Sequence, residues 1–363
     1  MINITQYVKD ELHTFDEKPF NPVDSLILAW MSYIKYPYSI VVPNSFNGIK
    51  IKDLYLAEHF DVMFKRVYDE PASREIFSYL ACNPRYRNIE VKGYRVTFDK
   101  DEEKQFAAAT FKLKEGLHYV SFRGTDATIV GWKEDFNMAY SYAVPAQVEA
   151  ANYLNDVMKQ IKGDILIGGH SKGGNLAVYA AINCDDKYKS RIKKIYSHDG
   201  PGFHKEVLES EDFLKIGDKI EKTVPQSSVF GMILESQENF NIVKSNKMSF
   251  WQHNPFSWMI EGDDFVKVDS LAAGARYFDS TISDWMYSKT REERELFIDT
   301  LFEIIETTDA KTFKDISNQW SKNAPLIFNT AANVDDETKS FIKSTVVELI
   351  KTAFKNVPEL FKK

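Results

Sequence analysis

The chain has 363 residues and a net charge of −7, with 44% hydrophobic and 27% charged residues. This balance is typical of a globular protein, and its mild acidity excludes a broad electrostatic attraction to nucleic acid or to anionic membranes. We find no apolar stretch as long as a membrane span, no signal-peptide pattern, and only two cysteines, too few for a disulfide framework. We therefore expect a protein of a reducing, cytoplasmic compartment, without stable membrane insertion.

The expected elements begin with helices and continue with strands. Residues 1–85 are expected to be mostly helical, with Asn21 as an N-cap before Pro22 and a further helical pattern over 51–68. Residues 88–123 hold three runs rich in β-forming residues. We expect two antiparallel strands there that lead into a third, buried strand.

Strands and helices then alternate. A helical pattern over 147–163 precedes a buried strand at 164–169, a helix at 171–184 and a strand at 192–200. This alternation predicts an α/β fold whose mostly parallel central sheet is covered by helices on both faces. Helical periodicity returns after about residue 270.

No internal repeat and no low-complexity linker divides the chain. We therefore interpret residues 1–363 as a single domain with its core at about 86–270. A helical N-terminal segment, 1–85, and a helical C-terminal segment, 271–363, are expected to pack on this core.

Ser171 is the candidate nucleophile. It is the centre of a Gly-x-Ser-x-Gly pattern, Gly169 to Gly173, between the predicted strand and the predicted helix. A serine on such a sharp turn exposes its hydroxyl above the sheet, and the glycines make room for the turn. The alternative is a tight turn whose serine only caps the helix.

A nucleophilic serine needs a histidine base, and on this architecture the base follows the serine in the chain. His253 fits that order, whereas His198 and His204 flank a strand end and His170 adjoins the serine, where it more readily packs or orients the turn. The other histidines precede Ser171 and fit the order badly: His13, His59 and His118. Aromatic residues around His253 fit either an apolar acyl pocket or core packing: Trp251, Phe256 and Trp258.

Asp199 is the favoured acid because it ends the strand after the nucleophile, at the edge where parallel sheets carry their active sites. Its alternative use is an Asp-Gly turn. Asp218 and Glu221, one strand later, remain open as candidates.

The oxyanion of an acyl-transfer reaction needs preorganised backbone donors. We expect these donors to be the N–H groups of Lys172, the residue after the serine, and of Thr125, in the loop after an earlier strand. Arg123 and Asp126 in that loop fit a structural ion pair as well as a direct role. No cysteine and histidine cluster has the spacing of a metal site, and the glycine-rich turn lacks the ending of a phosphate loop, so no metal or cofactor is expected.

These motifs resemble those of the α/β-hydrolases, and of the class 3 lipases among them. Residues 121–126 are similar to that group's oxyanion segment, Trp132 and Asp135 to the Trp-x-x-Asp that follows it, and 168–181 to its nucleophile turn and helix. Together with residues 199–203 and 224–258, they resemble more closely an uncharacterised bacterial family called Mbeg-like. The chain departs from the class 3 pattern at Lys222 and Thr223, where those lipases usually carry the acid.

The resemblance implies an α/β-hydrolase fold and a serine hydrolase activity, but no particular substrate. Our leading hypothesis is a serine hydrolase that acts on a small-molecule or lipid ester. An acyltransferase that uses the same residues and a non-catalytic interaction protein of the same fold are the alternatives.

Overall fold

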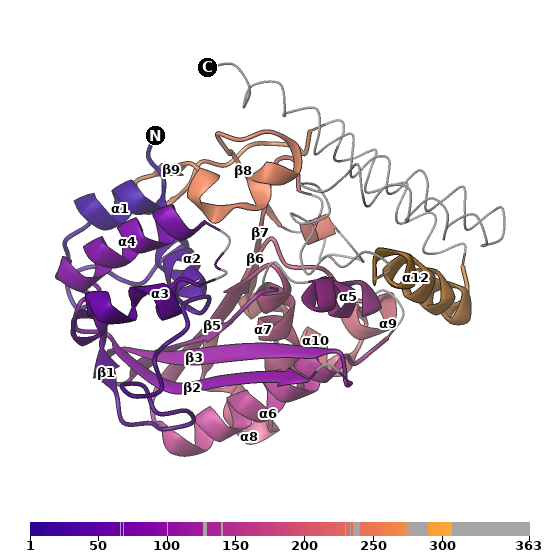
Figure 1. Cartoon of the computed structure of the whole chain (residues 1–363), viewed down its shortest axis with the longest axis horizontal. Helices are drawn as coiled ribbons and strands as arrows, with labels where there is room; N and C mark the ends of the chain where they lie inside the picture. Colours follow the sequence, from indigo (N-terminus) through magenta and orange to yellow (C-terminus); the bar gives the residue numbers. More distant parts are fainter. Residues whose placement is uncertain are drawn as a thin grey trace.

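A computed structural model describes residues 1–306, except for 66, 68, 100, 126–128, 139–140, 229, 233, 235–239, 273–274 and 276–288. In this part of the chain eight strands form one sheet in which they follow one another in sequence order (Figure 1). The first four are antiparallel, and β4 to β8 are parallel. The strands are β1 (Ile49–Lys50), β2 (Glu90–Asp99), β3 (Lys104–Lys114), β4 (Leu117–Phe122), β5 (Asp164–His170), β6 (Ile192–His198), β7 (Ile220–Pro225) and β8 (Asn241–Val243).

The described α-helices lie before, between and after these strands. They are α1 (Ile4–Asp10), α2 (Pro22–Met31), α3 (Phe60–Met63), α4 (Glu70–Cys82), α5 (Ile129–Asn137), α6 (Pro145–Gln160), α7 (Lys172–Asn183), α8 (Asp186–Lys189), α9 (Lys205–Leu208), α10 (Glu211–Leu214) and α12 (Arg291–Glu306). Short 3₁₀ turns and a small hairpin complete the described elements: η1 (Ile51–Leu54), η2 (Ala57–His59), η3 (Gly217–Lys219), η4 (Phe230–Met232), η5 (Ser249–His253), η6 (Pro255–Ser257), β9 (Ile260–Glu261) and β10 (Asp264–Phe265).

The strand order decides which helices cover which face of the sheet. Because crossovers between parallel strands are right-handed, strands laid down in sequence order receive their connecting helices on one face. That face carries Val120, Ile167 and Ile195, which are buried in one core with α6 and α7.

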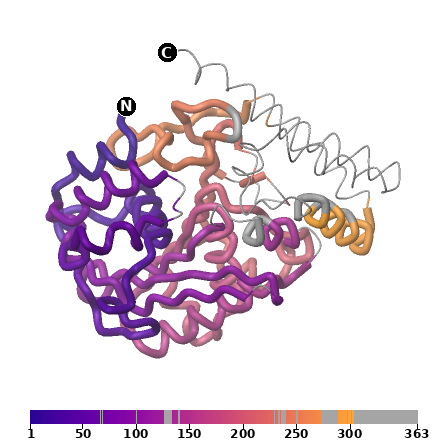
Figure 2. Tube along the Cα trace, viewed as in Figure 1, coloured from indigo at the N-terminus to yellow at the C-terminus, as the bar shows by residue number. Residues whose placement is uncertain are grey.

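The other face is covered by the N-terminal part of the chain. Tyr119, Leu166 and Tyr196 alternate with the residues of the first face and are buried in a second core with α1, α2, α4 and the region around 260. Figure 2 shows that region beside the N-terminus, and Ile2 pairs with Ile260 there. The predicted α/β fold, mostly parallel with helices on both faces, is confirmed.

Local signals around the sheet account for some elements and fail for one. Asn21 caps α2 as predicted, since its side-chain oxygen accepts the N–H groups of Val23 and Asp24, both at 3.0 Å. The helix predicted over 51–68 is wrong. The N–H of Ile51 donates to the carbonyl of Ile89 at 3.0 Å, and the stretch forms η1, η2 and the four-residue α3 instead. The hydrogen bonding of this stretch to the residues before β2 thus outweighs its helical spacing of apolar residues.

At the other end of the described chain, α12 lies against α5 (Figure 1). The rings of Phe136 and Phe302 are 5.7 Å apart, and Lys133 pairs with Asp299 at 3.1 Å. Residues 307–363, most of the C-terminal segment expected to be helical, lie outside the described residues. The single-domain interpretation of the chain therefore stays a prediction.

Candidate active site

Ser171 stands on the turn between β5 and α7, as the glycine pattern predicts. Its backbone has φ of +59° and ψ of −135°, a conformation that a residue with a side chain adopts only under strain and that clusters at functional sites. A Cβ atom at Gly169 would lie 2.3 Å from the carbonyl carbon of Gly173, and one at Gly173 would lie 2.1 Å from the Phe122 carbonyl oxygen. The turn therefore requires glycine at both positions.

Asp199 follows β6 directly and is fully buried, with a φ of +51°. One carboxylate oxygen, Oδ2, lies 2.6 Å from Nδ1 of His253. The other, Oδ1, accepts the hydroxyl of Ser228 at 2.5 Å and the N–H of Gly231 at 3.2 Å. The carboxylate is thus held from both sides, and it faces one nitrogen of the imidazole.

His253 lies at the carboxyl ends of β5 and β6. Its carbonyl oxygen accepts the Nε2–H of His170 at 2.8 Å, and its ring centroid is 4.6 Å from that of His170 and 4.4 Å from that of Phe230. The N–H of Ser171 donates to the last carbonyl of β6 at 2.9 Å, which ties the serine to the strand that ends before Asp199. With Nδ1 facing the carboxylate, Nε2 is the nitrogen that can serve a serine hydroxyl.

His170 is held by a residue that sequence reasoning missed. Its Nε2 must carry the proton because its partner, the His253 carbonyl, can only accept. Its Nδ1 therefore accepts the hydroxyl of Tyr33, 3.2 Å away. Burial lowers the pKa of His170 well below its usual value, and the nearby His253 lowers it further. A neutral His170 thus links the segment after α2 to the backbone of His253.

The loop after β4 passes directly against the candidate nucleophile. A Cβ at Gly124 would lie 2.5 Å from the His170 carbonyl oxygen and 3.0 Å from Cβ of Ser171. Thr125 comes next, and Lys172 begins α7, where the first N–H groups of a helix have no partner within the helix. Lys172 is thus next to Ser171 in the chain, and Thr125 follows the glycine that packs against Ser171.

Two neighbouring carboxylates behind this loop hold those donor residues by their side chains. The hydroxyl of Thr125 lies 2.7 and 2.5 Å from the two oxygens of Asp135. The ammonium of Lys172 lies 2.6 Å from Glu134 and 3.7 Å from Asp135. Burial raises the pKa of Asp135 to about 6, an effect that the charge of Lys172 opposes. Asp126 lies outside the described residues, so its pairing with Arg123 stays a prediction.

The competing candidates lie elsewhere. Asp218 is in η3, and Glu221 is near the start of β7, beside Tyr196, where it pairs with Lys194 at 3.0 Å. Both lie near the amino end of that strand, whereas Ser171 and Asp199 follow the carboxyl ends of theirs.

Three of the other histidines bond to groups outside the candidate site. His198 bonds to Ser25 at 2.9 Å and His204 to the Met138 carbonyl at 3.0 Å. His13 bonds to Glu11, and His118 is buried on β4. His59 ends η2, among the N-terminal helices.

The aromatic residues near His253 divide between core and surface. Trp258 is fully buried, and Phe256 packs in the same core, with its ring 5.1 Å from that of Trp30. Trp258 and Phe256 are therefore core residues, which is one of the two interpretations that the sequence left open. Trp251 is 38% exposed.

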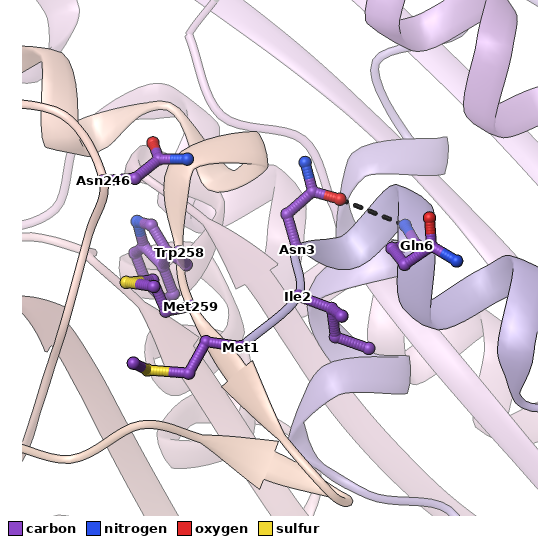
Figure 3. A pocket seen from close by; sticks show the side chains of 7 residues that line it. All are labelled: Met1, Ile2, Asn3, Gln6, Asn246, Trp258 and Met259. Carbon is purple, nitrogen blue, oxygen red and sulfur yellow. Dashed lines mark hydrogen bonds between the residues drawn. The ribbon is translucent and has the colours of Figure 1, made fainter.

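A surface hollow of about 300 Å³ lies at the N-terminus, beside Asn246 and Trp258 (Figure 3). None of the candidate catalytic residues lines it. Within the described residues no group of three or more His, Cys, Asp or Glu side chains is arranged for a metal ion, and no described helix has the length and apolarity to cross a membrane.

The solved structures that are similar to this chain include two lipases. The chain is similar to the Rhizomucor miehei lipase in its propeptide complex, with 14% identity over 47% of this chain and 66% of the other and a TM-score of 0.34. It is also similar to M37 lipase, with 12% identity over 56% of this chain and 67% of the other and a TM-score of 0.34. No curated protein matches it.

The family model described as Mbeg1-like matches residues 80–303, which is more than half of the chain. The matched region includes the turn at Ser171, the Asp199–His253 pair and the carboxylates of α5. The chain belongs to the Mbeg1-like family.

Proposed function

We propose that the chain is a serine hydrolase that cleaves a carboxylic ester through an acyl-enzyme on Ser171. The observation that carries the proposal is the Asp199–His253 pair at 2.6 Å, with the second carboxylate oxygen held by Ser228 and Gly231, beside a serine with strained backbone. A buried carboxylate on Nδ1 fixes the imidazole tautomer and stabilises the imidazolium that forms during reaction.

In the proposed mechanism Nε2 of His253 takes the proton of the Ser171 hydroxyl as its oxygen attacks the ester carbonyl. The N–H groups of Lys172 and Thr125 donate hydrogen bonds to the carbonyl oxygen and stabilise the negative charge that develops on it. The imidazolium then gives its proton to the leaving alcohol, and an acyl-enzyme remains. Water, activated by the same imidazole, releases the acid.

The test is labelling of the full chain by a fluorophosphonate, which reacts with activated serines, followed by mass spectrometry. We expect the adduct on Ser171, and a loss on the order of 10⁶-fold in ester hydrolysis for Ser171→Ala. Ser121→Ala is the matched control, because that serine is fully buried on β4 and bonds to the Leu28 carbonyl.

Three outcomes separate the functions. An unlabelled chain contradicts the proposal and favours a non-catalytic interaction protein of this fold. An adduct on another serine shows that the nucleophile is that serine and not Ser171. Labelling of Ser171 with faster turnover when an alcohol is added indicates acyl transfer in place of hydrolysis.

A further inference from the structure

The side chain of Lys172 is unusual for the residue that follows a candidate nucleophile. Its ammonium group is fully buried and donates to Glu134 Oε2 at 2.6 Å and to the Gln105 carbonyl at 3.0 Å. Glu134 is also fully buried, and its two oxygens accept the N–H groups of Gln105 and Ala146, both at 3.0 Å. This one carboxylate therefore joins β3, α5, α6 and the first residue of α7.

Stability alone is a weak reason for such a pair. Removing two charges from water costs about as much as their attraction returns, and well-packed apolar side chains of similar size often serve a fold as well or better. What the pair does provide is a fixed geometry. Lys172 cannot shift at the start of α7 without leaving Glu134 buried and uncompensated.

Asp135, the next residue of α5, holds the side chain of the other candidate donor residue, Thr125. Asp135 lies next to Glu134 in the chain and accepts the hydroxyl of Thr125. The two residues whose N–H groups are the candidate oxyanion donors, Lys172 and Thr125, are thus tied by their side chains to two consecutive carboxylates of one helix.

We propose that the buried Lys172–Glu134 pair is a positioning device that sets the Lys172 N–H against the Thr125 N–H in the oxyanion hole. The inference rests on the proposed serine hydrolase function and goes beyond it. Glu134 is a positioning residue, because it acts through Lys172 and lies behind the hole. Removal of a whole oxyanion donor costs on the order of 10²–10³ in rate, so a misplaced donor should cost about 10- to 100-fold.

The experiment compares the wild type with the double variant Lys172→Met/Glu134→Gln. This change removes both charges together, so no lone buried charge destabilises the fold. The new amide oxygen can accept from Ala146, but the amide NH₂ group cannot accept from the Gln105 N–H that bonds to the carboxylate. Fluorophosphonate labelling gives the maximal inactivation rate, which reports the chemical step, and the inhibitor constant, which reports binding. We expect a folded chain with a somewhat lower melting temperature, because the Gln105 N–H loses its acceptor, an inhibitor constant within about threefold of the wild type, and an inactivation rate at least tenfold lower.

The chain offers a matched control pair. Arg85 and Asp24 form another fully buried ion pair, also at 2.6 Å. It joins α2, which contains Asp24, to the segment that follows α4. The double variant Asp24→Asn/Arg85→Met should change the stability of the chain and leave the inactivation rate of its folded molecules unchanged. An equal loss of rate in both double variants would overturn the proposal, because the pair near Ser171 would then be no more than structural.

A fall of less than tenfold in Lys172→Met/Glu134→Gln, with Ser171 labelled in the wild type, overturns the positioning role and leaves the proposed function intact. A wild type that is not labelled at Ser171 overturns the proposed function and this inference with it. If the double variant does not fold, Lys172→Arg, which keeps both charges paired but changes the geometry of the pair, is measured against the same tenfold threshold.

Discussion

Replacing Asp199 by asparagine tests the candidate acid through its hydrogen bonds. Oδ1 accepts from Ser228 and Gly231, and Oδ2 faces Nδ1 of His253. An amide has one acceptor and one donor group, so its oxygen must take the Oδ1 position, where the Gly231 N–H can only donate. Its NH₂ group then faces Nδ1 of His253, which must become an acceptor.

This arrangement moves the ring proton of His253 to Nε2, the nitrogen that should accept the proton of Ser171. We therefore expect labelling of Ser171 to fall by about 10⁴-fold, the loss found when a triad acid becomes an amide, while circular dichroism shows an intact fold. Asp218→Asn and Glu221→Gln are the controls and should label within about twofold of the wild type. Near-normal labelling of Asp199→Asn, with a collapse in either control, would refute the reasoning.

Three further predictions concern single side chains. Ser228→Ala removes one charge-assisted hydrogen bond from Asp199 and leaves the bond from the Gly231 N–H. The rate of Ser171 labelling should therefore fall by about tenfold, and the melting temperature of the variant serves as the control that it is folded. Asp135 has its pKa raised to about 6 in the folded chain, so its ionisation costs stability as the pH rises from about 4 to 6. Relative to the wild type, Asp135→Asn should gain up to about 3 kcal/mol in free energy of unfolding between pH 4 and 7 in urea titrations, and no gain would contradict the raised pKa. Burial lowers the pKa of His118 to about 4, so the unfolded chain binds the proton first and stability falls as the pH drops below about 6.5. His118→Gln should reduce that fall by up to about 1.4 kcal/mol per pH unit between pH 6 and 4, and an unchanged slope would show that His118 is not the group involved.

The sequence predicts those parts of the site that depend on local signals. Glycines on both sides of Ser171, between an apolar run and a helical pattern, predict the turn, and the structure has β5 and α7 there. Asp199 is predicted at a strand end from the same kind of pattern, and β6 ends one residue before it. The catalytic roles of these residues and of His253 stay predictions until activity is measured.

The remaining parts of the site depend on contacts that no local pattern records. Tyr33 reaches His170 across 137 positions of the chain, and Ser228 reaches Asp199 across 29. Glu134 and Lys172 appear in the sequence as ordinary charged residues, a type that is almost always solvated unless it is paired. Their burial becomes visible only when β3, α5 and α7 are brought together.

The strand order explains why the N-terminal segment belongs with the site. Since β4 to β8 follow one another in sequence, their crossover helices cover one face of the sheet, and the apolar residues of the other face need a cover from outside this repeat. Helices α1, α2 and α4 supply it, although the family match begins only at residue 80. The same segment carries Tyr33, whose hydroxyl bonds to Nδ1 of His170, and His170 in turn bonds to the backbone of His253. The cover of the sheet and the support of the candidate base thus come from one stretch of chain, so a fragment cut at residue 80 would lose both.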